Sequence, residues 1–307
     1  RAWTIVPGPQ GGGGGEVPTG SITEFEDGFE SGNFDKYNWI FASWLPGGGG
    51  EPSEYDQNGS YALKIVDGGA GHPDVARFEL RDGDISAGSE RVELEMKSEY
   101  DTHEGDERWY EFDVRLGDPD WPAATSWLLF WQWHHAGGTG SPPLDLGPDN
   151  HNENFNTIII GGDGLPSAPR PTLFEIEPGA WRSVVMHVKF SEDPEVGFVE
   201  AHVDGQLVVP RTFRATMVDA SNYLKFGIYR DDSHTDTHVV MFDNIRISYG
   251  PATGGPDLTT AAGRFGWGTP LSEWSDEFNY TGAPNDAKWS LYNGTGHNGN
   301  GRRRPER

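Results

Sequence analysis

The sequence predicts an all-β protein, a two-sheet sandwich of the β-jelly-roll type. Its 307 residues include 43 Gly and 22 Pro, and 12% of them are aromatic. Runs rich in Val, Ile, Thr and aromatic residues alternate in hydrophobicity and are separated by Gly, Asn and Asp, as expected for strands and turns. No segment has a sustained helical period. So many strands in one domain favour two packed sheets.

The series of predicted strands begins within residues 24–39, where short apolar runs are broken by acidic residues and Gly. An Asp-Gly pair at 204–205 predicts a hairpin turn. The later predicted strands are 61–66, 75–81, 91–97, 108–116, 126–134, 155–160, 181–190, 197–203, 223–230 and 238–248.

Two low-complexity segments bound this β-domain, which we expect to span residues 23–250. Residues 1–22 contain PGPQGGGGGEVPTG, a composition typical of a flexible linker, and residues 251–272 form a second predicted linker. No apolar run approaches membrane-spanning length. The chain begins with Arg and not with Met, so we expect a monomeric piece of a longer modular polypeptide that is secreted, with its targeting signal outside this sequence.

The composition excludes several classes of function. The chain has no Cys, which excludes disulfides, thiol catalysis and thiolate zinc sites. Its net charge of -25 argues against nucleic acid or an anionic membrane as a general partner, because the long-range field repels both. An anionic polymer could bind only in a locally basic cleft.

The most informative stretch is SNYLKFGIYRDD, residues 221–232. Read as a strand, it points Leu224, Phe226 and Ile228 to one face, which is apolar. The opposite face carries Tyr223, Lys225 and Tyr229 around Gly227. We interpret the glycine as clearing space for a bulky anionic ligand. The alternative is an amphipathic strand with an ordinary solvated face.

Two further strands carry polar pairs at the same alternating spacing. In SWLLFWQWHH, Gln132 and His134 share one face and the neighbouring tryptophans share the other. In GSERVEL, Arg91 and Glu93 share a face. Each pattern is weak alone, since a strand His is often structural and an Arg-Glu pair is often a surface ion pair. The three patterns together indicate a site.

In this order, RVEL (91–94), QWH (132–134) and YLKFGIY (223–229) resemble the signature strands of jelly-roll polysaccharide lyases. Alginate lyases of family 7 carry R-S/T-E-L, Q-I/V-H and Y-F-K-A-G-x-Y. The flanking segments are more similar to glucuronan lyases of family 20 and to heparin lyase I. The resemblance covers residues 24–249. Arg77 and Glu79 belong to a second R-x-E-L, and we favour Arg91 because its strand stands where the signature is expected.

The resemblance implies β-elimination from a 4-linked uronic-acid polymer, with glucuronan as first choice and alginate or another polyuronate next. The uronate charge must be neutralised before the C5 proton can leave, a role that falls to Arg91, Gln132 and His134. Tyr229 is expected to take this proton and to protonate O4, because C5-H and O4 lie on the same side of a glucuronate ring. His134 is the alternative base.

Further residues are expected to contact the polymer or the phenol. Positive charge nearby favours the phenolate that a tyrosine base requires, and Lys225 and Arg91 would supply it. The expected substrate-binding residues are Lys225, Tyr223, Glu93, Arg77 and His135.

We expect no cofactor to be required for catalysis. Asp243, with Glu26 or Asp27, resembles the structural calcium sites of many secreted β-sandwich carbohydrate domains, and oxygen ligands suit that cation. Solvated turn carboxylates are the alternative, and the sequence leaves both readings open.

Two other functions compete with a lyase. A noncatalytic carbohydrate-binding module would keep the sandwich and bind sugars through exposed tryptophans. A glycoside hydrolase is disfavoured because no strand carries a cluster of the E-x-D-x-x-E kind. Residues 273–307, which contain WSDEF, resemble only the N-terminal edge of a glycoside hydrolase family 16 domain and lack its catalytic strand.

Overall fold

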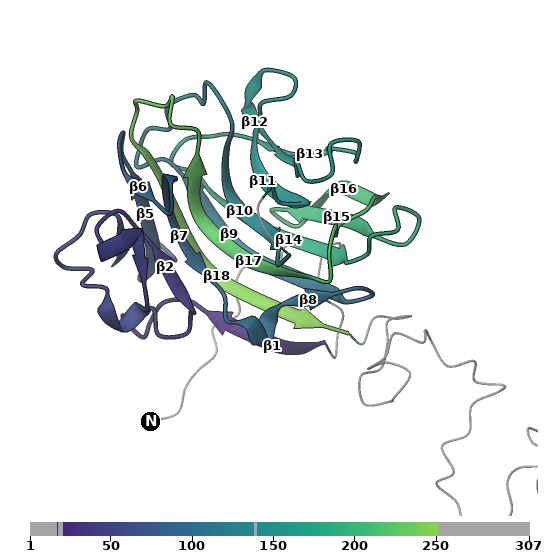
Figure 1. Cartoon of the computed structure of the whole chain (residues 1–307), viewed down its shortest axis with the longest axis horizontal. Helices are drawn as coiled ribbons and strands as arrows, with labels where there is room; N and C mark the ends of the chain where they lie inside the picture. The colour runs from purple at the N-terminus through teal and green to yellow at the C-terminus, as the bar shows by residue number, and fades with distance from the viewer. Residues whose placement is uncertain (1–16, 18–20, 138–139, 251–307) are drawn as a thin grey trace, which may run out of the picture. The chain divides into compact units, whose positions relative to one another are not determined.

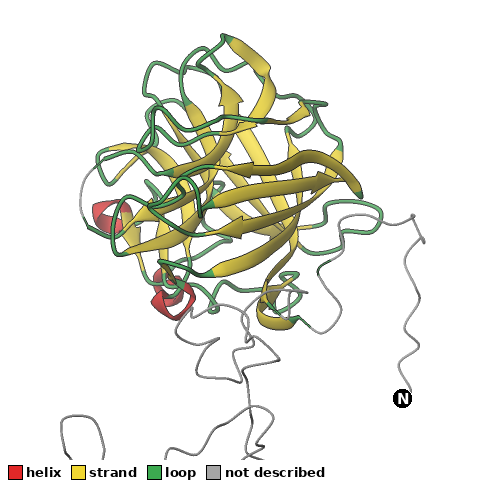
Figure 2. Cartoon of the chain, turned by 90° about the vertical axis from the view of Figure 1, so that its right-hand side faces the viewer, coloured by secondary structure: helices red, strands yellow, loops and turns green. Residues whose placement is uncertain are grey.

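The computed structural model describes residues 17, 21–137 and 140–250, which form two antiparallel sheets packed face to face (Figures 1 and 2). In order, the first sheet contains β16 (Gln206–Phe213), β15 (Phe198–Val203), β14 (Trp181–Lys189), β9 (Glu107–Leu116), β18 (His238–Tyr249), β5 (Val75–Leu80) and β4 (Leu63–Val66), with β1 (Ile22–Asp27) paired to β18. The prediction of an all-β jelly-roll sandwich is confirmed.

The second sheet carries the three signature strands side by side in its middle, as Figure 1 shows. Its order is β13 (Thr172–Glu175), β12 (Asn154–Ile160), β11 (Leu144–Asp149), β10 (Leu128–His135), β17 (Ser221–Arg230), β7 (Ser89–Glu95), β2 (Trp39–Phe41) and β3 (Gly49–Gly50). Two short strands add to it, β6 (Ile85–Ser86) on β7 and β8 (Thr102–His103) on β17.

In the part of the chain that the structure describes, helix is confined to three short 3-10 turns, η1 (Pro46–Gly48), η2 (Pro52–Glu54) and η3 (Ser98–Tyr100). Within the described ranges, no helix has the length and apolar character needed to cross a bilayer. The first strand starts at Ile22, one residue inside the predicted linker. The predicted second linker and the segment resembling family 16 lie outside the described residues.

Aromatic side chains from both sheets fill the space between them. Trp131 of β10 stacks on Phe112 of β9 with ring centroids 4.2 Å apart, and it also stacks on Phe226 of β17 at 5.4 Å. Phe242 of β18 meets Phe226 at 5.1 Å. All four rings are buried. Removing such a ring costs about 3–5 kcal/mol of stability, so these contacts fix which face of β10 and β17 turns inward.

A β-bulge between β10 and β17 interrupts the simple alternation. Leu129 pairs with Tyr229, but Trp131 pairs with Phe226, so two residues of β17 lie opposite the single residue Phe130 of β10. Phe130 and Trp131 are therefore both buried, and Gln132 returns to the outer face. The bulge keeps Leu129 and Gln132 on one side of the sheet, which strict alternation would not allow.

Gly227 allows β17 to approach β7 closely. Its φ is +139°, and a Cβ atom there would lie 2.2 Å from the Val92 carbonyl oxygen and 2.8 Å from Glu93 Cα. The expectation that this glycine clears space for a ligand is therefore wrong, because a side chain would collide with the neighbouring backbone. The residue instead sets the spacing between two signature strands.

We expect Gly227→Ala to lower the free energy of unfolding by about 3 kcal/mol or more, because it adds a backbone clash to an unfavourable φ. Denaturant unfolding measures the loss. Gly32→Ala is the matched control, since Gly32 has a φ of +71° and no atom within 4 Å of the added carbon. It should lose only about 1 kcal/mol. Equal losses in the two variants would refute the role given to the close approach.

Candidate active site

The outward face of the second sheet, called here the site face, gathers polar side chains from β7, β10 and β17. The antiparallel register pairs Tyr229 with Arg91, Gly227 with Glu93 and Lys225 with Gln132. Tyr223 pairs with His134. Because directly paired residues point to the same face, the side chains lie in rows across the sheet. These are the residues that the three sequence patterns single out.

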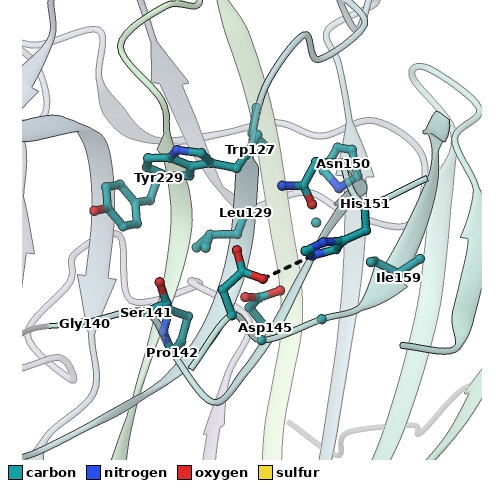
Figure 3. A pocket seen from close by; sticks show the side chains of 16 residues that line it. Trp127, Leu129, Gly140, Ser141, Pro142, Asp145, Asn150, His151, Ile159 and Tyr229 are labelled. Atoms are coloured by element: carbon teal, nitrogen blue, oxygen red, sulfur yellow. Dashed lines mark ion pairs between the residues drawn. The ribbon is translucent and has the colours of Figure 1, made fainter. Parts of the chain in front are cut away.

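At one end of the site face, Tyr229 lies against a cation and a second aromatic ring. The Arg91 guanidinium carbon is 4.0 Å from the centre of the Tyr229 ring, and Trp127 meets that ring edge-on at 4.8 Å. Tyr229 and Trp127 border a cavity of about 150 Å³ (Figure 3). No hydrogen bond to the Tyr229 hydroxyl is found within the described residues. The phenol therefore combines an adjacent cation with an uncommitted hydroxyl.

The middle of the site face is a buried charge cluster around Glu93. Gln132 Nε2 donates a hydrogen bond to Glu93 Oε1, while Arg91 NH1 lies 3.6 Å and Lys225 Nζ lies 3.9 Å from Glu93 Oε2. Glu93, Gln132 and Lys225 are all buried. Burial lowers the pKa of Lys225, and the Glu93 carboxylate opposes this shift. One carboxylate thus holds two cations and the amide in place.

Gln132 and Lys225 are less accessible than the sequence led us to expect. Gln132 has no exposed surface, and its Oε1 atom has no hydrogen-bond partner within the described residues. Lys225 Nζ lies 5.4 Å from the centre of the Tyr223 ring and 5.2 Å from that of Phe41. Arg91 therefore supplies the positive charge in contact with Tyr229. Lys225 is buried and lies beside Tyr223 and Phe41 instead.

The other end of the site face holds His134 and Tyr223, whose ring centres are 5.3 Å apart. His134 Nδ1 is 2.8 Å from the His135 carbonyl oxygen, and Nε2 is 3.0 Å from that of Gly140. Burial is the main cause that lowers the pKa of His134, and the charge of Lys225 adds to this effect. The hydrogen bonds to the two backbone carbonyl groups act in the opposite direction. Burial and the nearby carboxylates Glu95 and Glu93 raise the pKa of Tyr223 to about 12.

His134 and Tyr229 do not touch. The register places His134 opposite Tyr223, six residues along β17 from Tyr229, which is roughly 20 Å of extended backbone. His135 is the last residue of β10, and its Nδ1 atom lies 3.4 Å from Asp219 Oδ2. The site face therefore has two separate ends joined by the charge cluster.

Arg77 lies elsewhere. It belongs to β5 of the first sheet, where its NH1 donates to Glu79 and its Nε donates to Asp118. Phe78 and Leu80 of the same strand are buried in the core, so alternation turns Arg77 to the far side of the sandwich. Its assignment to substrate binding is wrong.

The three carboxylates expected to hold calcium are not brought together. Asp243 pairs with His72 Nδ1 at 2.7 Å, and Asp27 pairs with Lys36 at 2.9 Å. Glu26 is exposed and lies 3.9 Å from Arg246. No group of three or more potential metal ligands occurs within the described ranges. These residues therefore do not fit the expected ligand set, although Asp27 Oδ2 is buried without a hydrogen-bond partner there.

The sequence patterns missed the far wall of the cavity beside Tyr229. This wall includes Asp145 of β11 and, beyond it, His151, whose Nε2 atom lies 3.1 Å from Asp163 Oδ1 (Figure 3). The segment LDLGPD does alternate, with Leu144 and Leu146 buried on either side of Asp145. No strand was predicted between residues 134 and 155, because the Gly and Pro residues of this segment are unusual in the interior of a strand.

We expect Glu93→Gln to lower the free energy of unfolding by about 3 kcal/mol at neutral pH, because it leaves two nearly buried cations without their anion. The pKa of Lys225 in the folded protein should fall further, since Glu93 now raises it. At pH values between this lowered pKa and the ordinary pKa of lysine, Lys225 would be protonated in the unfolded chain but neutral in the folded protein. Stability should consequently rise with pH across that window.

Denaturant unfolding at several pH values measures this effect. Glu177→Gln is the control, because Glu177 pairs with Arg182 but its side chain is 68% exposed, and its loss should stay below about 1 kcal/mol. A loss at Glu93 no larger than that of the control would contradict the central position of this carboxylate.

Comparisons with solved structures find the same fold. The crystal structure of the endo-β-1,4-glucuronan lyase from the fungus Trichoderma reesei superposes with a TM-score of 0.54 and 17% identity, over 75% of this chain and 96% of that one. Alginate lyase A1-II', a member of polysaccharide lyase family 7, gives a TM-score of 0.50 and 14% identity, over 72% and 98%. At these identities the similarity shows the fold alone.

A search of curated proteins found no match. The family model described as "Polysaccharide lyase" matches residues 29–246, which include all three signature strands and most of the described residues. The chain belongs to the polysaccharide lyase family.

Proposed function

We propose that this lyase cleaves a 4-linked uronic-acid polymer by β-elimination, with a glucuronan-like polymer as first choice and alginate or another polyuronate next. The observation that carries the proposal is the contact between Arg91 and Tyr229, the residue that borders the cavity. The buried Lys225 is a second cation on the same face. A uronate carboxylate and a tyrosine base both require positive charge at the same point. We also propose that the protein acts outside the cell, where such polymers occur.

The first requirement of the reaction is neutralisation of the uronate carboxylate, which makes the C5 proton acidic enough to remove. Arg91 is partly exposed, and its guanidinium carbon lies 4.0 Å from the centre of the Tyr229 ring on the site face. Its guanidinium can therefore bind the carboxylate. The carboxylates near Arg91 and Lys225 are Glu93 and Glu95, so an incoming uronate would meet positive charge at the partly exposed Arg91 and not a net excess of charge over the whole cluster.

The second requirement is proton transfer at C5 and O4. In our proposal the Tyr229 phenolate takes the C5 proton, the C4–C5 double bond forms, and the C4–O4 bond breaks. Tyr229, now a phenol, returns the proton to the departing O4 and is a phenolate again. The products are an unsaturated uronate end and a new hydroxyl end, and no water is consumed.

His134 fits the role of base less well than Tyr229. A base needs a nitrogen lone pair that faces the substrate, and both ring nitrogens of His134 face backbone carbonyl oxygens. We therefore assign His134 to binding the polymer at the far end of the site face, together with Tyr223. The hydroxyl of Tyr229 has no such competing partner within the described residues.

Tyr229→Phe should reduce kcat by at least about 1,000-fold while KM changes little, because it removes the proton carrier but keeps the ring against Arg91 and Trp127. The release of unsaturated uronate, followed by ultraviolet absorbance on glucuronan and alginate, measures the rate. Tyr223→Phe is the matched control and should keep most of its kcat, because its phenol is assigned to contact with the polymer and not to proton transfer.

The variant His134→Ala separates the two candidate bases. It should mainly raise KM if His134 binds the polymer. Near-native activity of Tyr229→Phe beside an inactive His134→Ala would show that His134 is the base. A wild-type protein that binds polyuronate but releases no unsaturated product would favour the binding module.

A further inference from the structure

Asp145 occupies a position in the site that the proposed mechanism does not use. It lies on β11 directly opposite Gln132 of β10, and Gln132 in turn lies opposite Lys225 of β17. Asp145 therefore belongs to the same row as the charge cluster and points to the site face. It also lines the cavity that Tyr229 borders. A sugar unit in this cavity would adjoin the unit whose bond Tyr229 cleaves.

The Asp145 carboxyl group is available to a ligand. The group has no hydrogen bond or ion pair to another side chain within residues 21–137 and 140–250, although it is largely buried. Gly161 makes room for it, because a Cβ atom on Gly161 would lie 2.4 Å from Asp145 Oδ1. Figure 3 shows Asp145 beside His151 and the ion pair that His151 forms. The neighbouring acid Asp163 is satisfied, whereas Asp145 is not.

The charged neighbours of Asp145 come from three segments. Asp163 and Arg170 lie between β12 and β13, Arg214 follows β16, and His151 lies after β11. Burial and the Asp163 charge raise the pKa of Asp145 to about 7, against the opposing effect of Arg214 and Arg170. Asp163 itself pairs with both His151 and Arg170 at 3.1 Å. Asp145 thus changes its charge in the neutral range.

We propose that Asp145 is a specificity-determining residue that binds the polyuronate as a neutral acid, donating a hydrogen bond to an oxygen of the sugar unit in the cavity. This inference rests on the proposed function, since it assumes an anionic polymer. The ionised form places a carboxylate against the polymer's negative charge and binds it poorly. Substrate affinity must then fall as the pH rises.

The size of the effect follows from the titration. With a pKa of about 7, the neutral fraction of Asp145 falls from about 0.9 at pH 6 to about 0.1 at pH 8. If only the neutral form binds well, KM rises about tenfold over this range. Asp145→Asn keeps a hydrogen-bond donor of nearly the same shape but cannot ionise. Its KM should therefore change less than about twofold between the two pH values.

The experiment measures KM and kcat at pH 6 and pH 8 on the polyuronate that the wild-type protein cleaves fastest. Asp145→Ala, which has neither donor nor charge, should show a raised KM at both pH values. Glu195→Gln is the matched control for loss of one negative charge, because Glu195 is exposed in the loop between β14 and β15 of the other sheet. It should keep the wild-type ratio of the two KM values.

Equal ratios of KM at pH 8 and pH 6 in the wild type and in Asp145→Asn would overturn the role of Asp145. A wild-type KM that falls as the pH rises would also overturn it, because the carboxylate would then be the binding form, as for a neutral sugar. Failure of the proposed function is distinct, since it would appear as no unsaturated product from any polyuronate at either pH.

Discussion

The alternation of β17 is the constraint on which the site depends. Phe226 and Ile228 are buried between the sheets, and Phe226 packs against aromatic rings of both β10 and β18. Because neighbouring residues of a strand point to opposite faces, this packing commits Lys225 and Tyr229 to the site face. Gly227 then brings β7 close enough for Arg91 to cover the Tyr229 ring. The geometry of the candidate site is therefore a consequence of core packing.

The position of Arg91 would allow an acidic protein to bind the anionic polymer that we propose as its substrate. The chain carries a net charge of -25, which would repel a polyuronate at long range. At the site, Arg91 is partly exposed, and its partial burial strengthens its interaction with an incoming carboxylate. The Glu93 carboxylate partly neutralises the two cations Arg91 and Lys225, but it also keeps their side chains from moving apart. In our proposal, the ionisation of Asp145, which lies opposite Gln132, adds a pH-dependent charge beside this cluster.

Much of the fold and most of the site could be predicted from the sequence because both follow from alternation. Residue spacing predicted the strands, the inward tryptophans of β10 and the outward row of polar residues, and the resemblance to polysaccharide lyases identified the signature strands among them. Features that depend on how strands meet could not be read in this way. The bulge at Phe130 and the close approach at Gly227 are properties of a strand pair, and neither leaves a clear mark on a single strand.

The errors have similar physical causes. Arg77 stands in the same R-x-E-L pattern as Arg91, but only the sheet to which its strand belongs decides that it faces away from the site. The strand β11 was hidden by Gly147 and Pro148, and Asp145 was hidden with it. The acidic residues expected to share a cation are held apart by ion pairs with Lys36 and His72, partners that no local pattern predicts.

The most direct test of the account is the mass of the products released from an oligouronate of defined length. Elimination through Tyr229 divides the substrate without adding water, so the masses of the two products should sum to the mass of the substrate, with one product carrying the C4–C5 double bond. A sum larger by one water molecule would reveal hydrolysis and would contradict the mechanism proposed for this site.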